Sequence, residues 1–350
     1  MHPLVSAYVR PVLLPLPGGE GRGEGAAART RVGTNALGRG PRPAPGWQLI
    51  HSAPIRHWLR IAAGVGVAAV LNTVAAHPIT AITLRDDRNV ELSFSASPQR
   101  IVSLVPSVTE SICALSACTR LVGTDQFSNF PPEVVALPKL GGLEDAQIER
   151  IVSLKPDAVL AAKSARVVDR LESLGVKVMV LQSDSHADVK RTLALLAKLL
   201  NAPEQAAKVW SEIERDIKLA ASLVPQALRG KKVYFEVATD PYAAGATSFI
   251  GETLTRLGMR NIAPIALGPF PKLNPEFVVR SQPDIIMAVD RQVKTMADRP
   301  GWQGLTALKG QSCGFATERY EVLIRPGPRM GEAALAIADC LAGLRVHQTP

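Results

Sequence analysis

The stretch that decides the fold runs from residue 100 to residue 162. It reads RIVSLVPSVTESICALSACTRLVG, then a loop rich in Phe, Pro and Gly, then EDAQIERIVSLKPDAVLAA. Its apolar runs at 101–105, 120–124 and 158–162 predict three short strands, and the first suits a buried strand of a parallel sheet. Helical patterns lie between these runs. Strands that alternate with helices are typical of an α/β protein.

Two helix starts are expected within this stretch. Ser107 and Glu110 have the spacing of a capping box, in which the hydroxyl bonds the amide three residues on and the carboxylate reaches back. The helix that they start is expected to reach about residue 115. Asp145 is predicted to cap a second helix, whose apolar residues share one side. Pro156 ends that helix because proline cannot continue one.

Residues 232–289 repeat the same plan. A strand is predicted at 232–237, and Ser248 lies at a helix start. Glu149 and Glu276 each stand seven residues before the proline of a Pro-Asp pair that ends a short helix. Repeated strand–helix–strand units predict two α/β lobes of similar design.

Length and charge set the broad class. The chain has 350 residues, enough for two domains with cores of their own. Eight arginines and two glutamates fall within residues 1–76, so this stretch carries +6 of the net charge of +9 and the rest carries only +3. Binding of nucleic acid needs a clustered basic face. We therefore expect no nucleic-acid partner.

The N-terminal region is expected to be removed or never made. Residues 1–55 are rich in Gly, Pro, Arg and Ala, and they read as a disordered leader or as the product of a misassigned start codon. Residues 56–76 have the positive, apolar and small-residue regions of a signal peptide. The apolar run is shorter than the ~18 residues of a spanning helix. Export to the periplasm, with cleavage near Ala76, is the expectation.

A long helix is predicted between the two lobes. We place the N-terminal lobe at 98–200, the spine helix and linker at 201–229, and the C-terminal lobe at 230–346. Within 204–224 an apolar face recurs at helical spacing, made by Ala206, Val209, Ile213, Ile217, Ala220 and Val224. Such a helix spans roughly 30 Å at 1.5 Å per residue. It predicts a stiff connector between the lobes.

Several segments, in order, resemble a known family. They are RIVSLVPSVTE, LPKLGGLEDAQIERIVSLKPDAVLA, RLESLGVKV, SFIGETL, GPFPKLNPEFV and RPGPRM. They are similar to the helical-backbone (class III) periplasmic substrate-binding proteins of ABC importers, and most like the vitamin B12-binding members. The resemblance covers residues 98–344. It implies two Rossmann-like lobes joined by one spine helix, with a ligand cleft between the lobes.

The resemblance also implies a function and partners. The protein would capture a large organic ligand, a corrinoid, and deliver it to an ABC importer permease with its ATPase subunits. An iron–siderophore or haem binder of the same class is the alternative. Glu149 and Glu276 match the two glutamates, one per lobe, that dock onto permease arginines. Read alone, they are solvated carboxylates near helix N-termini, where the helix dipole favours them. A monomer is expected.

Ligand contacts carry over from the resemblance unevenly. Pro106 and Ser107 match the loop that faces the cleft. Phe270 lies where the B12-binding members have a cleft tryptophan, whereas Leu143 and Ala162 replace two others. Their loss weakens the corrinoid assignment, since flat aromatics pack well on a large macrocycle. The candidate ligand residues are Pro106, Ser107, Phe127, Phe130, Lys163, Tyr242, Phe270, Lys272 and Arg329.

Each of these candidates has a simpler interpretation. Phe127, Phe130 and Phe270 lie in loops beside prolines, where binding residues gather, but packing under a loop is an alternative. Tyr242 and Trp302 are offered as partial replacements for the missing tryptophans. The four cations Lys163, Lys272, Arg325 and Arg329 are suited to an anionic group of a ligand, or they are surface charges.

The four cysteines suggest two disulfide pairs. Export favours a disulfide between Cys113 and Cys118, with two buried free thiols as the alternative. Cys313 and Cys340 can pair only if the last helix packs on that strand.

Four of the six histidines lie at or before residue 77, so no metal site is expected. The chain has no G-x-S-x-G elbow. We therefore expect a binding protein without a cofactor, with an α/β enzyme on the same scaffold as the remote alternative.

Overall fold

The computed structural model describes residues 81–239 and 241–344. The expected leader at 1–55 and signal peptide at 56–76 lie outside the described residues. Within the described part of the chain, no helix combines the length and apolar character needed to cross a membrane.

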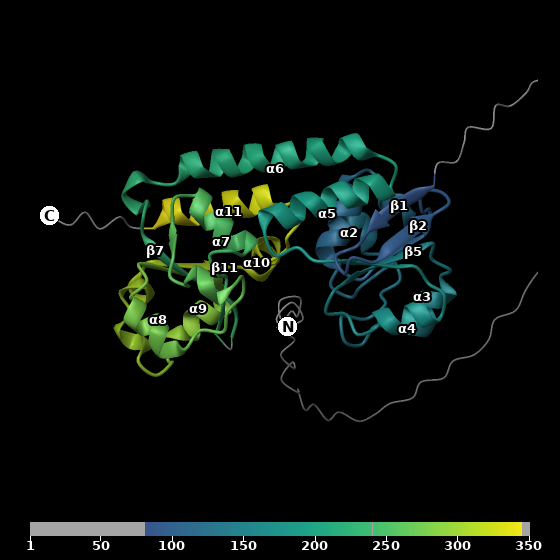
Figure 1. Ribbon diagram of the computed structural model, residues 1–350. Coiled ribbons are helices and arrows are strands. Elements are labelled where there is room, and N and C mark those ends of the chain that lie inside the picture. Colours follow the sequence, from purple (N-terminus) through teal and green to yellow (C-terminus); the bar gives the residue numbers. More distant parts are fainter. Residues whose placement is uncertain (1–80, 240, 345–350) are drawn as a thin grey trace, which may run out of the picture. The chain divides into compact units, whose positions relative to one another are not determined.

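The N-terminal lobe, which contains α2, α3, α4 and β5 in Figure 1, is built on a parallel sheet with the strand order β4-β3-β5-β6. Its strands are β3 (Ile101–Ser103), β4 (Leu121–Thr124), β5 (Ala158–Ala162) and β6 (Val178–Leu181). Its helices are α2 (Pro106–Ala114), α3 (Ile148–Ser153), α4 (Val168–Ser173) and α5 (His186–Leu199). The three strands expected from the sequence are thus present, in the expected order.

An antiparallel hairpin precedes this sheet and joins it. It consists of β1 (Ile82–Arg85) and β2 (Glu91–Phe94). Asp87 N donates to the Val180 carbonyl at 3.0 Å, and Val180 N donates to the Asp86 carboxylate at 3.1 Å. The hairpin therefore covers the edge strand β6, and the N-terminal lobe begins before residue 98.

The C-terminal lobe contains a mostly parallel sheet with the order β11-β10-β7-β8, and β9 also pairs with β7. Its strands are β7 (Lys232–Ala238), β8 (Tyr242–Ala243), β9 (Arg260–Asn261), β10 (Ile285–Val289) and β11 (Ser312–Phe315). Its helices are α7 (Phe249–Arg256), α8 (Pro275–Ser281), α9 (Asp290–Met296), α10 (Thr317–Leu323) and α11 (Met330–Gly343). Short 3₁₀ turns lie at Cys118–Arg120, Pro132–Val134, Gln226–Leu228, Ile265–Leu267, Trp302–Gly304 and Thr306–Lys309.

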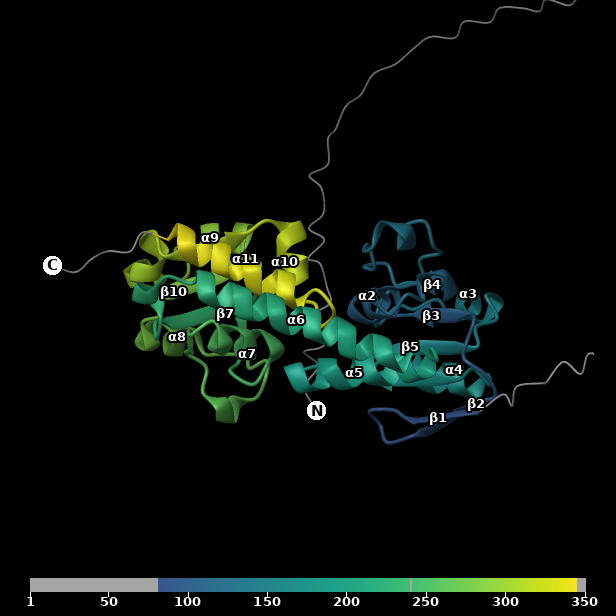
Figure 2. The same cartoon turned by 90° about the horizontal axis from the view of Figure 1, so that it is seen from above.

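The spine helix α6 (Pro203–Leu223) confirms the helix predicted at 204–224. The predicted apolar face is buried along its whole length. It packs on α5 at one end and on α11 at the other, as Figures 1 and 2 both show. Gly331 of α11 allows this close packing, because a Cβ there would lie 2.6 Å from Cβ of Asp216 on α6.

Neighbouring residues of each strand enter different cores, because side chains alternate across a strand. In the N-terminal sheet, Ile101 and Leu160 join the large core that includes α5 and α6, whereas Val102 and Val159 join a separate core with residues of α3 and α4. The C-terminal sheet divides in the same way. The large core runs through both lobes and the spine helix, which ties the lobes together along that side.

The described residues contain two disulfides and no free cysteine. One joins Cys113 to Cys118 across the end of α2. The other joins Cys313 on β11 to Cys340 on α11, with the Cα atoms 5.9 Å apart. The last helix does pack on that strand, which is the condition that the sequence set for this pair.

Helix starts differ in part from the prediction. Ser248 caps α7, as expected, and accepts from Gly251 N at 3.0 Å. The predicted capping box at Ser107 is wrong, because α2 begins at Pro106 and the Glu110 carboxylate binds two arginines instead. Asp145 does not cap α3 either. Its carboxylate accepts from Gly142 N at 2.7 Å and shapes the preceding loop.

Candidate ligand-binding site

Accessible aromatic and basic side chains lie where strands of both sheets end. In open α/β sheets, ligands bind outside the carboxyl ends of the strands. Phe127 and Phe130 follow β4, and Lys163 follows β5 directly. Phe130 is 40% exposed, Phe127 is half-buried and Lys163 is exposed. These three side chains remain available to a ligand on the N-terminal lobe.

Tyr242 and Lys272 make a matching pair on the C-terminal lobe. Tyr242 lies in β8, just beyond the carboxyl end of β7, and forms a β-bridge with Lys272. The Lys272 Nζ atom is 5.7 Å from the centre of the tyrosine ring. The ring is half-buried and the lysine is exposed. This pair offers an aromatic face beside a positive charge.

The carboxyl group of Asp184 lies near Lys163 in the N-terminal lobe. Burial raises the pKa of Asp184, which follows β6, and the nearby positive charge of Lys163 opposes that rise. The edge of the sheet between β5 and β6 is therefore mixed in charge. It does not present a purely basic surface to a ligand.

Two expected ligand residues are buried, and one of them, Ser107, meets the opposite lobe. Pro106 and Ser107 are buried at the start of α2. A Cβ on Gly327 of the C-terminal lobe would lie 3.2 Å from the Ser107 carbonyl oxygen and 3.3 Å from its Cβ. Here the two backbones approach closely, so this loop contacts the other lobe rather than an open surface.

Two other expected aromatics belong to the core. Phe270 is 8% exposed and packs edge-on against Phe249, with the ring centres 6.2 Å apart. Trp302 is fully buried and packs in the same way on Tyr234. Neither ring offers an open face to a ligand. The loop position of Phe270 suggests exposure, but both rings belong to the cores of the C-terminal lobe.

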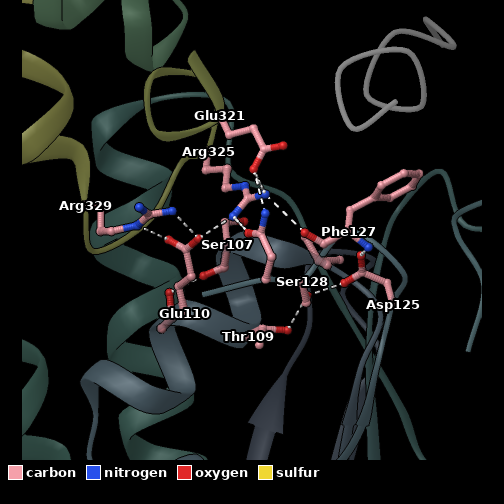
Figure 3. A network of polar contacts seen from close by, with 12 residues as sticks. Ser107, Thr109, Glu110, Asp125, Phe127, Ser128, Glu321, Arg325 and Arg329 are labelled. Atoms are coloured by element: carbon pink, nitrogen blue, oxygen red, sulfur yellow. Dashed lines mark hydrogen bonds and ion pairs between the residues drawn. The ribbon is translucent and has the colours of Figure 1, made fainter. Parts of the chain in front are cut away.

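Arg329, expected to meet an anionic ligand, is bound to a buried carboxylate from the other lobe (Figure 3). Its Nε and Nη2 atoms lie 2.9 Å and 2.7 Å from the two oxygens of Glu110 on α2. Arg325 Nη1 lies 2.8 Å from Oε1 of the same carboxylate. The Glu110 side chain is 1% exposed. We call Glu110, Arg325 and Arg329 the clamp, because they join the two lobes.

The clamp also reaches the loop at 126–131. Arg325 donates to the Phe127 carbonyl at 3.1 Å and to Asn129 Oδ1 at 2.8 Å. Arg329 lies over the Phe130 ring, 4.1 Å from its centre. Glu321 of α10 accepts from Arg325 at 2.8 Å and from Asn129 Nδ2 at 2.8 Å. Both aromatic residues of the loop are therefore held from the opposite lobe.

The N-terminal lobe supports the base of the same loop. Phe127 N donates to Asp125 Oδ1 at 2.7 Å, and the Ser128 hydroxyl bonds the same carboxyl group. Burial raises the pKa of Asp125. Lys139 Nζ donates to the Ser128 carbonyl at 2.6 Å. The base of the loop is thus fixed by its own lobe and the tip by the other.

A second contact between the lobes lies at the start of α5. The His186 ring Nε2 is 3.0 Å from the Phe249 carbonyl and 2.8 Å from the Thr253 hydroxyl, both on α7. The backbone amide of His186 donates to Glu252 at 2.6 Å. Burial lowers the pKa of His186. We call this the His186 contact.

The two glutamates matched to permease docking occupy equivalent, open positions. Glu149 lies in the first turn of α3 and Glu276 in the first turn of α8. Both are exposed, and Glu276 stays 78% exposed although Arg280 is 3.7 Å away. Among the described residues, no group of three or more His, Cys, Asp or Glu side chains could hold a metal ion.

Comparison with known proteins identifies the family. Residues 101–312 match the model of the family described as periplasmic binding protein. The chain belongs to this family. The two-lobed α/β fold expected from the sequence is confirmed for this periplasmic binding protein.

Three similar proteins illustrate the range of the family. The uncharacterised ABC transporter substrate-binding lipoprotein YvrC of Bacillus subtilis (strain 168) is 27% identical over 275 residues, which cover 74% of this chain and 85% of that protein. A vitamin B12-binding protein of Pectobacterium carotovorum subsp. carotovorum (strain PC1) is 26% identical over 254 residues, which cover 71% of this chain and 90% of that protein. The apo structure of the periplasmic heme-binding protein RhuT from Roseiflexus sp. RS-1 matches with a TM-score of 0.60 at 24% identity. The match covers 70% of this chain and 98% of that chain.

Sequence reasoning missed the clamp in this periplasmic binding protein. The local spacing predicts a capping-box role for Glu110, and no sequence pattern points to Glu321 or Asn129. Glu110 and Arg325 stand 215 residues apart, so no local pattern links them. The available signal was an acidic residue in a helix whose other positions are mostly apolar or small, because such a carboxylate needs a partner when buried.

Proposed function

We propose that this periplasmic binding protein captures a corrinoid between its lobes and delivers it to the permease of an ABC importer, which acts with ATPase subunits. The observation that carries the proposal is the set of accessible aromatics and lysines at the strand ends of both sheets. A similar protein is named a vitamin B12-binding protein, and another an ABC transporter substrate-binding lipoprotein. The mechanism is reversible binding and docking by a monomer, without bond chemistry.

A haem ligand is the main alternative, and one residue separates the two. Haem iron is held by a His, Cys, Met or Tyr side chain. Among the described residues, His186, Tyr234 and Tyr320 are buried among hydrogen-bond partners, the methionines are buried in the cores, and the cysteines form disulfides. Tyr242 is thus the best-placed axial ligand among the described residues. Both macrocycles supply four equatorial nitrogens, but cyanocobalamin also has both axial positions of its cobalt filled, by its own base and by cyanide, and would use Tyr242 only as a packing surface.

Titration tests the ligand. Calorimetry of the mature protein with cyanocobalamin should give a one-to-one complex, and Phe127→Ala should weaken it about tenfold, since a well-packed aromatic contributes ~1.5 kcal/mol beyond its area. Tyr242→Phe should leave cyanocobalamin affinity almost unchanged. If haemin binds instead, with a tyrosinate absorbance spectrum that Tyr242→Phe removes, the haem alternative replaces the corrinoid. Binding of a ferric siderophore alone would favour the third class.

Docking is tested separately from ligand binding. Two separated carboxylates suit charge-assisted pairing with two permease arginines, and such pairs fix orientation more than they add affinity. Glu149→Gln with Glu276→Gln should leave ligand affinity unchanged and lower transport into reconstituted vesicles at least tenfold. Lysine at both positions should be worse, because like charges then oppose each other.

The matched control for docking is Glu204→Gln with Glu318→Gln. These residues are also exposed carboxylates in the first turns of helices, α6 and α10. Their replacement should leave transport normal. Normal transport by the double lysine variant at 149 and 276 would remove the docking assignment.

The proposal places the protein in the periplasm after export. The expected signal peptide at 56–76 predicts a mature chain that starts close to His77. N-terminal sequencing of the protein from its native host tests this. A mature chain that retains residues 56–76 would contradict cleavage and indicate that the uncleaved segment tethers the protein to the membrane.

A further inference from the structure

The loop at 126–131 takes its tip contacts from the opposite lobe. Asn129 and Phe130 are exposed, and their side chains contact three residues of the C-terminal lobe, Arg325, Arg329 and Glu321. The base of the loop is bonded to Asp125 and Lys139 of its own lobe. The loop is therefore ordered in two halves by two different parts of the molecule.

The two arginines share one buried partner. The side chains of Arg325 and Arg329 are 9% and 15% exposed, and both donate to Glu110. A buried charge is tolerated only when it is paired and hydrogen-bonded. Glu110 satisfies this need for both guanidiniums at once. Its carboxylate fixes where they stand and hence where they can support the loop.

We infer that Arg325 and Arg329 are positioning residues that act from the opposite lobe. They hold Phe127 and Phe130, which we call the aromatic wall of the ligand site. In this arrangement Phe127 and Phe130 reach their positions only while the clamp joins the lobes. Separation of the lobes would release the tip of the loop together with its aromatic rings. The ligand role of the wall rests on the proposed function, whereas the ordering of the loop by the clamp does not.

Loop mobility gives a test that needs no ligand. Backbone ¹⁵N relaxation of the mature protein should give order parameters near 0.85 for Asn129 and Phe130, and Arg325→Gln should lower them below about 0.6. The matched control is Arg319→Gln, which removes the same charge from α10 but breaks only the exposed pair with Asp339. The control should leave the loop unchanged.

A milder variant covers the case in which Arg325→Gln does not fold. Asn129 is exposed, so Asn129→Ala removes its bonds to Arg325 and Glu321 without opening the core. It should loosen the tip of the loop in the same measurement. Order parameters that stay at wild-type values in Asn129→Ala, and in Arg325→Gln where it folds, would overturn the inference.

Ligand affinity then tests whether Arg329 acts through the ring that it covers. With cyanocobalamin as the probe, Arg329→Gln and Phe130→Ala should each weaken binding about fivefold, and the double variant should be no weaker than the worse single one. Non-additivity of this kind marks residues in one unit, and additive losses would contradict positioning through Phe130. If wild-type protein does not bind cyanocobalamin, the proposed function fails, but the relaxation test of the loop still decides the inference.

Discussion

At the clamp, one buried carboxylate on α2 holds two arginines of the C-terminal lobe, whereas at the His186 contact one buried imidazole at the start of α5 bonds a carbonyl and a hydroxyl of α7. The first contact is made of full charges and touches the loop with the accessible aromatics. In the second, a neutral imidazole bonds uncharged groups, and a backbone amide donates to the Glu252 carboxylate, beside the spine helix. The lobes are thus joined by two contacts that should respond differently to mutation, to pH and to salt.

The largest effect is expected from the loss of the carboxylate at the clamp. Glu110→Ala leaves Arg325 and Arg329 without the partner that both share. Removing one partner of a buried ion pair costs about 3–5 kcal/mol. We expect a loss of that size in the free energy of unfolding, measured by urea denaturation.

The control for this variant is Glu318→Ala. Glu318 is an exposed carboxylate at the start of α10, the helix that leads to Arg325. Its loss should change the free energy of unfolding by less than about 0.5 kcal/mol. Equal losses in the two variants would show that the burial and pairing of Glu110 add nothing to the free energy of unfolding beyond the contribution of an exposed carboxylate.

The clamp also shows where sequence reasoning reaches its limit. Local patterns predicted the strands, the buried face of α6 and the cap at Ser248, because these depend on residues a few positions apart. The capping box at Ser107 had equally good local spacing. It failed because arginines more than 200 residues away bind the carboxylate of Glu110 more favourably than a backbone amide does.

The candidate site illustrates the same limit for aromatics. Phe130 and Phe270 both lie in loops beside prolines, yet one is 40% exposed and the other 8%. Whether a loop folds over the sheet depends on contacts that its own sequence does not contain. Lys163 and Tyr242 each follow a strand that the sequence predicts, and both side chains are accessible, so their roles in ligand binding stay predictions.

A pH-dependent effect of intermediate size is expected at the His186 contact. Burial lowers the pKa of His186 in the folded protein, with the charge of Glu252 opposing the shift. Nδ1 lies 3.3 Å from an Arg256 nitrogen, so protonation would set two cations against each other. The unfolded chain therefore binds a proton more readily than the folded one.

The sign of the linkage follows from this difference. Stability from His186 is fully present above its ordinary pKa of 6.5 and is lost as the pH falls from there toward the lowered value. The loss is at most about 1.4 kcal/mol per pH unit. Urea denaturation at pH 7.5 and pH 5.5 should show a smaller drop for His186→Gln than for the wild type. The same drop in both proteins would mean that another group controls this pH range.

The smallest effect is expected from the ion pair that borders the His186 contact. Arg256 makes two hydrogen bonds to Glu214 of α6, at 2.8 Å and 2.6 Å, but both side chains are about a third or more exposed. Exposed pairs contribute only about 0.2–1 kcal/mol and weaken in salt.

Glu214→Gln should therefore lower the free energy of unfolding by no more than about 1 kcal/mol. This loss should shrink at high salt, whereas the loss in Glu110→Ala should persist. The guanidinium of Arg256 lowers the pKa of Glu214 below its ordinary value of 4.5, so this pair keeps its contribution above pH 4.5 and loses it as the pH falls further. Denaturation of both variants at low and high salt makes the comparison, and a salt-insensitive loss above 2 kcal/mol in Glu214→Gln would show that the border of the His186 contact is as well shielded as the clamp.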